Sequence, residues 1–221
     1  MKKDIHPIRK LIELGESQTL DFKFAINDSR KIARSLVAFA NSDGGTLLIG
    51  VRDNGSIAGI RSDEELHMVD TASFMYCKPE VKLDKHLWNI ERKEVLEVKI
   101  ARQHSSSLFS VKEENNKEQV YIRIQDENVA VNSIYLSAWA KKHQDKGIKL
   151  SYTEREKEFL KLFESDEYFT LEELKKQSNF STKDLKLLLI NFIALDFILI
   201  HFFNQGIYYQ RNNHHKALEN E

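Results

Sequence analysis

Cysteine, proline and glycine are all scarce in this chain. Its 221 residues include one cysteine, two prolines and eight glycines. A single cysteine, Cys77, excludes a disulfide within the chain and is typical of a reducing environment. Few prolines and glycines favour regular helices and strands joined by short loops. The sequence therefore predicts a folded protein without disulfides.

Long apolar runs and a strong net charge are also lacking. Asn191, Asp196 and His201 interrupt the densest apolar run, Leu187 to Phe203, and no run reaches the roughly 18 residues of a membrane span. The first residues predict no signal peptide. The formal net charge of -1 exerts no general attraction on nucleic acid. We therefore expect a cytoplasmic protein with no membrane partner, in which a local basic patch carries any nucleic-acid binding.

What the chain does contain is an ordinary globular composition in two differently patterned parts. Hydrophobic residues make up 41% and charged residues 30% of the chain, as in typical folded domains. Residues 1–146 mix helical and strand patterns, and residues 151–211 predict a smaller second domain. The polar stretch 145–150 separates the two, and the polar tail 212–221 is expected to be mobile.

The first part alternates between helical and strand periodicity. Ile32, Leu36 and Phe39 recur at helical spacing between residues 28 and 41. Thr46 to Val51 is almost continuously apolar, as in a central strand covered on both faces. The predicted helices are 6–14, 28–41, 62–76 and 133–143, and the last of these closes the first domain. The predicted strands are 20–24, 46–51, 57–60, 86–91, 95–101 and 119–124. Of these, 57–60 is expected to return as the hairpin partner of 46–51.

The second part has the element order of a winged helix. Helical patterns at 152–163, 171–177 and 181–195 precede strand patterns at 197–203 and 207–210. Three helices followed by a hairpin form the winged-helix variant of helix-turn-helix. A DNA-reading third helix is polar and basic, whereas this helix carries two lysines and is apolar from Leu187 to Ile190. Dimerisation or protein contact therefore competes with DNA binding as the role of this part.

Two segments near the N-terminus form one ordered motif. The first, Glu16 to Lys23, has the sequence ESQTLDFK, and the second, Ala38 to Gly55, has the sequence AFANSDGGTLLIGVRDNG. With Ile57 to Ile60, they resemble the Schlafen AlbA-type domain, also called the divergent AAA domain. Val120 to Ile124 is similar to the Tyr-x-Arg strand of that family. The resemblance implies an α+β fold: a mixed-sheet Schlafen AlbA-type domain followed by a small winged-helix-like domain, as in bacterial transcriptional regulators.

The resemblance also implies a catalytic alternative. Mammalian Schlafens have a related core that cleaves RNA with three acidic metal ligands, and the motif places these ligands at Glu16, Asp21 and Asp53. Carboxylates commonly hold Mg²⁺ or Mn²⁺ in phosphodiester hydrolysis. Each acid also has a local interpretation, as a group at a helix end, a strand edge or a turn. A ribonuclease with these three residues as catalytic groups and metal ligands is therefore the alternative function.

The double glycine, Gly44-Gly45, has two interpretations. It ends the preceding helix, or it lets the backbone approach a phosphate. The P-loop sequence GxxxxGK[ST] is absent, and the glycines follow a helix instead of preceding one. The sequence therefore disfavours ATP as a cofactor, although some members of the family carry an ATP-binding label.

Basic residues gather around this turn and on the predicted helix 28–41. Such a cluster contacts nucleic-acid backbones through counterion release, and a solvated helix face has the same pattern. The leading prediction is a regulatory protein that binds DNA or RNA. A further alternative is a purely protein-interacting regulator that forms a homodimer through the apolar region 185–203 of the C-terminal domain. The predicted nucleic-acid-binding residues are Lys23, Arg30, Lys31, Arg34, Gly44, Gly45, Arg52 and Arg123.

Overall fold

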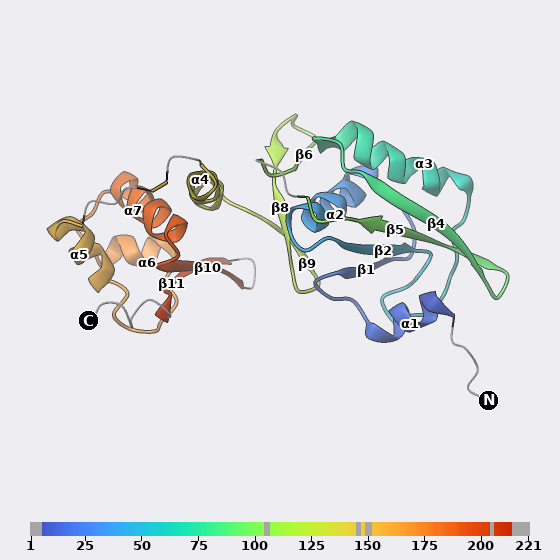
Figure 1. The fold of residues 1–221 in the computed structure, drawn as a ribbon, viewed down its shortest axis with the longest axis horizontal. Coiled ribbons are helices and arrows are strands. Elements are labelled where there is room, and N and C mark those ends of the chain that lie inside the picture. Colours follow the sequence, from blue (N-terminus) through green and yellow to red (C-terminus); the bar gives the residue numbers. More distant parts are fainter. Residues whose placement is uncertain (1–5, 104–106, 145–146, 149–151, 204–205, 214–221) are drawn as a thin grey trace. The chain divides into compact units, whose positions relative to one another are not determined.

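The chain forms two compact units of mixed α+β structure (Figure 1). The computed structural model describes residues 6–103, 107–144, 147–148, 152–203 and 206–213. One unit is Met1–Val131 and the other is Asn132–Glu221. The tail expected to be mobile lies, from residue 214 on, outside the described residues. Across the described ranges, every helix is too short or too polar to cross a bilayer.

The first unit is built on a four-stranded sheet. Strands β1 (Leu20–Lys23) and β2 (Gly45–Ile49) are parallel and are joined by helix α2 (Ser29–Asn41). Strands β5 (Lys93–Ile100) and β4 (Leu83–Ile90) extend the sheet antiparallel in the order β1-β2-β5-β4. Strand β2 is therefore central, as its apolar sequence predicts.

Helices cover both faces of this sheet (Figure 1). Leu36 of α2 packs on one face, where Leu47 of β2 belongs to the same core. Helix α1 (Pro7–Leu14) covers part of the other face, where its Ile8 shares a core with Phe22 and Leu48. Because successive strand residues point to opposite faces, Asp21 and Lys23 lie on the α2 side of β1.

Shorter elements complete the first unit. Helix α3 (Asp63–Thr71) continues into a π-helical turn, η1 (Ala72–Tyr76). A small sheet contains β3 (Cys77–Lys78), β6 (Ser110–Lys112) and β7 (Glu118–Gln119), and a hairpin pairs β8 (Tyr121–Ile124) with β9 (Glu127–Ala130).

Several of these short strands were not predicted. Strands β3, β6 and β9 contain two to four residues, which is too short for periodicity to identify. The predicted hairpin partner of β2, residues 57–60, makes only a single bridge between Val51 and Ile57.

The second unit has the predicted order of three helices and a hairpin. These are α5 (Glu154–Lys161), α6 (Leu171–Lys176), α7 (Thr182–Ala194), β10 (Ile198–Phe203) and β11 (Gly206–Arg211). Phe169 exchanges two backbone hydrogen bonds with Tyr209 of β11, at 2.9 and 2.8 Å, which adds a one-residue third strand.

Helix α4 (Ser133–Lys142) belongs to the second unit, whereas the sequence placed 133–143 at the end of the first. Its Ile134 lies in the same core as Leu185 and Leu189 of α7. Lys142 forms a 2.6 Å ion pair with Asp196, which follows α7. The units therefore divide at Val131, ahead of the predicted boundary at 145–150. An amphipathic pattern shows that a helix has an apolar face, but does not identify the core that receives it.

The glycines that end α2 are packed against the protein itself. Gly44 has φ 74°, and its N–H donates to the carbonyl of Phe39 at 2.9 Å. A Cβ on Gly44 would lie 2.7 Å from the amide nitrogen of Arg102, and one on Gly45 would lie 2.5 Å from the Phe39 ring. The protein fills the space that a phosphate would need beside Gly44. The turn therefore has the geometry of a helix end.

Gly44→Ala is expected to lower the free energy of unfolding by about 3 kcal/mol, through the left-handed φ and the clash with backbone atoms. Gly147→Ala is a matched control, because Gly147 has φ 63° but no atom within 4 Å of its added Cβ; its expected cost is about 1 kcal/mol. Urea unfolding of both variants measures the difference. Equal costs would contradict the packing argument.

Candidate functional site

Asp21 is the centre of a buried polar network in the first unit. The Asp21 residue is 2% exposed. The Lys23 ammonium donates to one Asp21 carboxylate oxygen and to the Phe22 carbonyl, each at 2.9 Å, and lies 2.8 Å from the other Asp21 oxygen. The Ser35 hydroxyl of α2 donates to Asp21 at 3.3 Å. Lys23 is therefore ion-paired with Asp21, so its charge is largely balanced within the fold.

Arg123 of β8 closes the network from the edge of β1. Its guanidinium lies 3.6 Å from Asp21, and its side chain is 1% exposed. It donates to the carbonyls of Ser17 and Leu20 at 3.2 Å and to the Asn128 side chain at 3.0 Å. The predicted phosphate contact of Arg123 is therefore corrected: burial removes this cation from any ligand at the surface, and its hydrogen bonds hold β8 to β1.

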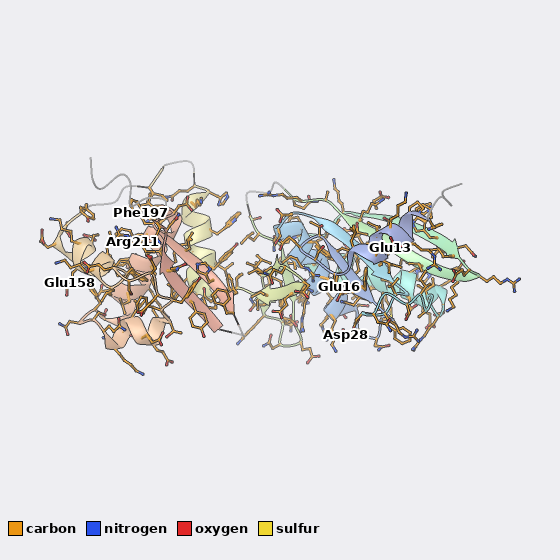
Figure 2. All side chains as sticks on the ribbon, turned by 90° about the horizontal axis from the view of Figure 1, so that it is seen from below. Glu13, Glu16, Asp28, Glu158, Phe197 and Arg211 are labelled. Atoms are coloured by element: carbon orange, nitrogen blue, oxygen red, sulfur yellow. The ribbon has the colours of Figure 1, made fainter. Side chains whose placement is uncertain are left out.

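Glu16 lies in the loop between α1 and β1 (Figure 2). Its carboxyl group is paired with that of Asp21. The Phe22 N–H donates to Glu16 at 2.8 Å. Burial raises the pKa of Glu16, and the hydrogen bond to Asp21 raises it further. Burial also opposes ionisation of Asp21, but the hydrogen bond from Glu16 and the charges of Lys23 and Arg123 prevail and lower the pKa of Asp21. Of the two carboxyl groups, Glu16 is therefore the one whose pKa is raised.

The structure brings together two of the three predicted metal ligands. Glu16 and Asp21 are hydrogen-bonded, while Asp53 lies in the exposed turn after β2. In the part of the chain that the structure describes, no group of three or more His, Cys, Asp or Glu side chains is placed to hold a metal ion. Asp21 already has Lys23, Arg123 and Ser35 as partners. The residues present therefore do not form a fitting site for Mg²⁺ or Mn²⁺.

Two of the predicted phosphate-binding arginines are paired with acids. The Arg34 guanidinium donates twice to Glu113, at 2.9 and 2.7 Å. This bidentate bond lowers the pKa of Glu113, so the pair is charged at neutral pH. Arg30 lies 3.4 Å from Glu114 and 4.9 Å from the Tyr76 ring. The basic face of α2 is therefore largely neutralised, and Lys31 remains exposed on it without an ion pair among the described residues.

A second group of cations lies beyond the ends of the two parallel strands. Phe24 follows β1 and is 38% exposed. The guanidinium carbons of Arg52 and Arg61 lie 4.5 and 4.9 Å from the centre of its ring. Both arginines are exposed, and neither has an acidic partner within the described ranges. Phe24, Arg52 and Arg61 together are called the arginine–phenylalanine cluster below.

A buried carboxylate fixes this cluster in place. Glu65 of α3 is 4% exposed. It accepts from the backbone N–H of Ile26 at 3.0 Å and from that of Arg61 at 2.8 Å. One side chain thus joins the loop after Phe24 to the backbone that carries Arg61. Gly50 donates to the Lys23 carbonyl at 2.8 Å and ties the segment before Arg52 to the end of β1.

The cluster and the double glycine lie at opposite ends of the β1–β2 pair. Lys23 is paired with Ile49 at the end of β2, whereas Gly45 begins that strand. Sequence reasoning selected Arg52 but missed Phe24 and Arg61 as site residues. The available signal was Phe24 itself, an aromatic residue at the end of the alternating pattern 20–24 and directly after the basic Lys23.

Asp21→Asn is expected to lower the free energy of unfolding by about 3 kcal/mol, because it leaves the buried Arg123 and the half-buried Lys23 without their anion. Asp43→Asn is the control, since Asp43 is exposed and lies 3.7 Å from an exposed Arg102; its expected effect stays within about 0.5 kcal/mol. Urea unfolding at neutral pH measures both. An unchanged free energy of unfolding in Asp21→Asn would contradict the central place of this carboxylate.

Glu16→Gln is expected to raise stability at neutral pH. The pKa of Glu16 is raised in the folded state. The stability that Glu16 contributes is therefore complete below its unfolded-state pKa and is lost as pH rises through its folded-state pKa. Glutamine keeps a donor for Asp21 and an acceptor for Phe22 without titrating. The gain in urea midpoint over wild type should be present at pH 7 and vanish near about pH 4. A gain that grows in acid, or an equal gain in the control Glu13→Gln, would contradict the assignment.

The match to a known protein family ends close to the last residue of the first unit, Val131. The model of the family described as Schlafen, AlbA_2 matches residues 16–132. A similar solved structure is the DIP2311 protein from Corynebacterium diphtheriae, at 15% identity and a TM-score of 0.43, covering 65% of this chain and 34% of that one. Another is the N-terminal domain of an ATP-dependent DNA helicase RecG-related protein from Nitrosomonas europaea, at 16% identity and a TM-score of 0.36, covering 52% of this chain and 81% of that one.

The family match carries the assignment. No curated protein matches this chain, and the chain spans only 34% of the length of the DIP2311 protein. The family model covers more than half of the 221 residues, including the whole motif from Glu16 to Gly55 and the late strand with Arg123. The chain belongs to the Schlafen AlbA_2 family.

Proposed function

We propose that the first unit binds the phosphate backbone of nucleic acid through the arginine–phenylalanine cluster. The observation that carries the proposal is the pair of exposed, acid-free guanidinium groups on an exposed ring, held by the buried Glu65. Arginine offers several N–H donors to a phosphate, and aromatic rings beside cations favour single strands. This cluster replaces the patch that the sequence placed around Gly44-Gly45.

The regulatory role rests on the second unit. We assign to this unit a winged-helix-like fold, supported by its element order and by the strand pairing of Phe169 with Tyr209. Together with an AlbA_2 unit, this arrangement supports a DNA-binding regulator of the type that the sequence resemblance implies. The exposed lysines of α7, Lys183 and Lys186, are at its N-terminal end, the end that a recognition helix directs at bases. The homodimer through this unit stays a prediction.

The ribonuclease alternative is less well supported by the geometry. Its three acids do not form a metal-holding group, and Asp21 is committed to internal partners. Asp53 is adjacent to Arg52 and is exposed. At this position a carboxylate weakens a phosphate-binding surface, because like charges repel. The two functions therefore predict opposite effects of neutralising Asp53.

Arg52→Ala and Arg61→Ala are each expected to weaken binding to oligonucleotides of any sequence. Each variant should reduce the slope of log affinity against log salt by about one, since one phosphate contact is lost. Fluorescence anisotropy with single-stranded and duplex oligonucleotides at several salt concentrations gives these slopes. Lys82→Ala is the control, because Lys82 is exposed near the opposite end of the sheet. Salt-independent binding, or an equal loss in the control, would reject the proposed surface.

Asp53→Asn separates binding from hydrolysis. If Arg52 contacts phosphate, removal of the neighbouring negative charge should tighten oligonucleotide binding, and the gain should shrink as salt screens the charges. If Asp53 is a metal ligand, the same variant should abolish cleavage of structured RNA in Mn²⁺ or Mg²⁺, as Glu16→Ala should. Cleavage by the wild type that both variants lose would favour the nuclease over the binder.

A further inference from the structure

Strand β10 of the second unit has one unpaired edge. The Phe197 carbonyl accepts from Asn212 at 2.8 Å, while the N–H and carbonyl of Tyr209 face Phe169. In an antiparallel hairpin, the backbone groups of successive residues point alternately toward the paired strand and away from it. These bonds show that Leu199, His201 and Phe203 direct their backbone groups at β11, and that the residues in alternation with them direct theirs outward. Ile198, Ile200 and Phe202 therefore present their N–H and C=O groups along the free edge. Within the described ranges, no strand pairs with this edge.

This edge has none of the usual protection against strand pairing. Natural edge strands carry lysine, proline, a bulge or an inward-pointing charge. The six residues of β10, Ile-Leu-Ile-His-Phe-Phe, include no charged residue except through protonation of His201 and no proline. Burial lowers the pKa of His201, so the strand is uncharged at neutral pH. Its pairing with β11 runs without a bulge from Ile198 to Phe203.

The outward face of the hairpin is apolar as well. Phe203 is 44% exposed and Tyr168 is 47% exposed. Tyr168 lies edge-on to His201 and to Phe203, with ring centres 5.0 and 5.2 Å apart. His201 is the one titratable side chain of β10 on this face, and burial lowers its pKa, so an incoming strand meets no charge on β10 at neutral pH. Nucleic acid is a poor occupant for the same reason, because the face offers no cation to a phosphate.

We propose that β10 of a second copy of this chain pairs with this edge, antiparallel and across a twofold axis at Ile200. The strand fits itself because its outward backbone groups are evenly spaced about Ile200. The axis places Ile200 opposite Ile200 of the other copy, and Ile198 opposite Phe202, with about six hydrogen bonds between the copies. A continuous sheet results, and the two cores lie on the same side of it. This dimer is independent of the nucleic-acid surface proposed for the first unit.

The register makes one contact diagnostic. Leu199 of one copy faces His201 of the other in a non-hydrogen-bonded pair, at a Cα separation of about 4.5 Å. That separation is within the range of a disulfide, whereas Leu199 and its own counterpart are diagonal neighbours, roughly 7 to 8 Å apart. The natural Cys77 is buried and does not compete. The double variant Leu199→Cys/His201→Cys should therefore form a covalent dimer on mild oxidation, and the single variant Leu199→Cys should not.

The mass of the full chain in solution tests the same edge without cysteines. Wild type should show a dimer mass by light scattering, and His201→Lys should show a monomer mass, because it places two charges in the strand pair. Tyr208→Lys is the matched control: Tyr208 pairs with His201 on the same face, but one strand away from the edge. This control should remain a dimer. Ile200→Pro, which removes an outward N–H without adding charge, should also be a monomer.

Circular dichroism of each variant identifies any that fails to fold. If one of the two edge variants, His201→Lys or Ile200→Pro, fails to fold, the mass of the other tests the proposal. A monomeric wild type at every concentration would overturn the proposal. So would a dimer whose mass is unchanged in both His201→Lys and Ile200→Pro. Failure of the double-cysteine variant to cross-link while wild type is dimeric would also overturn it, because the dimer would then use another surface.

Discussion

The first unit depends on one buried charge. Asp21 lies on a strand at the edge of the main sheet, and it is balanced by Lys23 from the same strand, by Ser35 from α2 and by Arg123 from β8. A buried anion needs close partners, because its desolvation is not otherwise compensated. The network therefore joins three elements that are distant in sequence, and it places the last strand pair of the unit against β1.

The same requirement divides the basic residues into two classes. Lys23, Arg34 and Arg123 are held by acids of the protein, so their charges are used within the fold. Arg52 and Arg61 follow the ends of buried segments and stack on Phe24 instead of pairing with an acid. Because a phosphate is attracted by charge that remains unbalanced, the free pair is the better binding surface, although the paired cations outnumber it.

Much of the fold followed from the sequence, and less of the site did. The apolar run of β2, the capped helix α2 and the helix-rich second unit were predictable, since periodicity and turn residues are local. Pairing is not local: Glu113 is far from Arg34 in sequence, and β8 is far from β1. A count of basic residues therefore selected Arg123 and Arg34 as ligand contacts, and only the geometry showed that they are committed elsewhere. For the same reason, the sequence did not predict that α4 packs in the core of the second unit.

The second unit shows how the absence of charge carries information. The core-facing residues of β10 explain why alternate positions are apolar, but they do not explain why Leu199 and Phe203, on the other face, are apolar too. A strand that is solvated on one face usually alternates. Apolar residues on both faces of an edge strand, beside an unpaired row of backbone groups, are expected where a further strand completes the sheet. A second β10 meets that need, because it supplies the same backbone spacing and the same lack of charge.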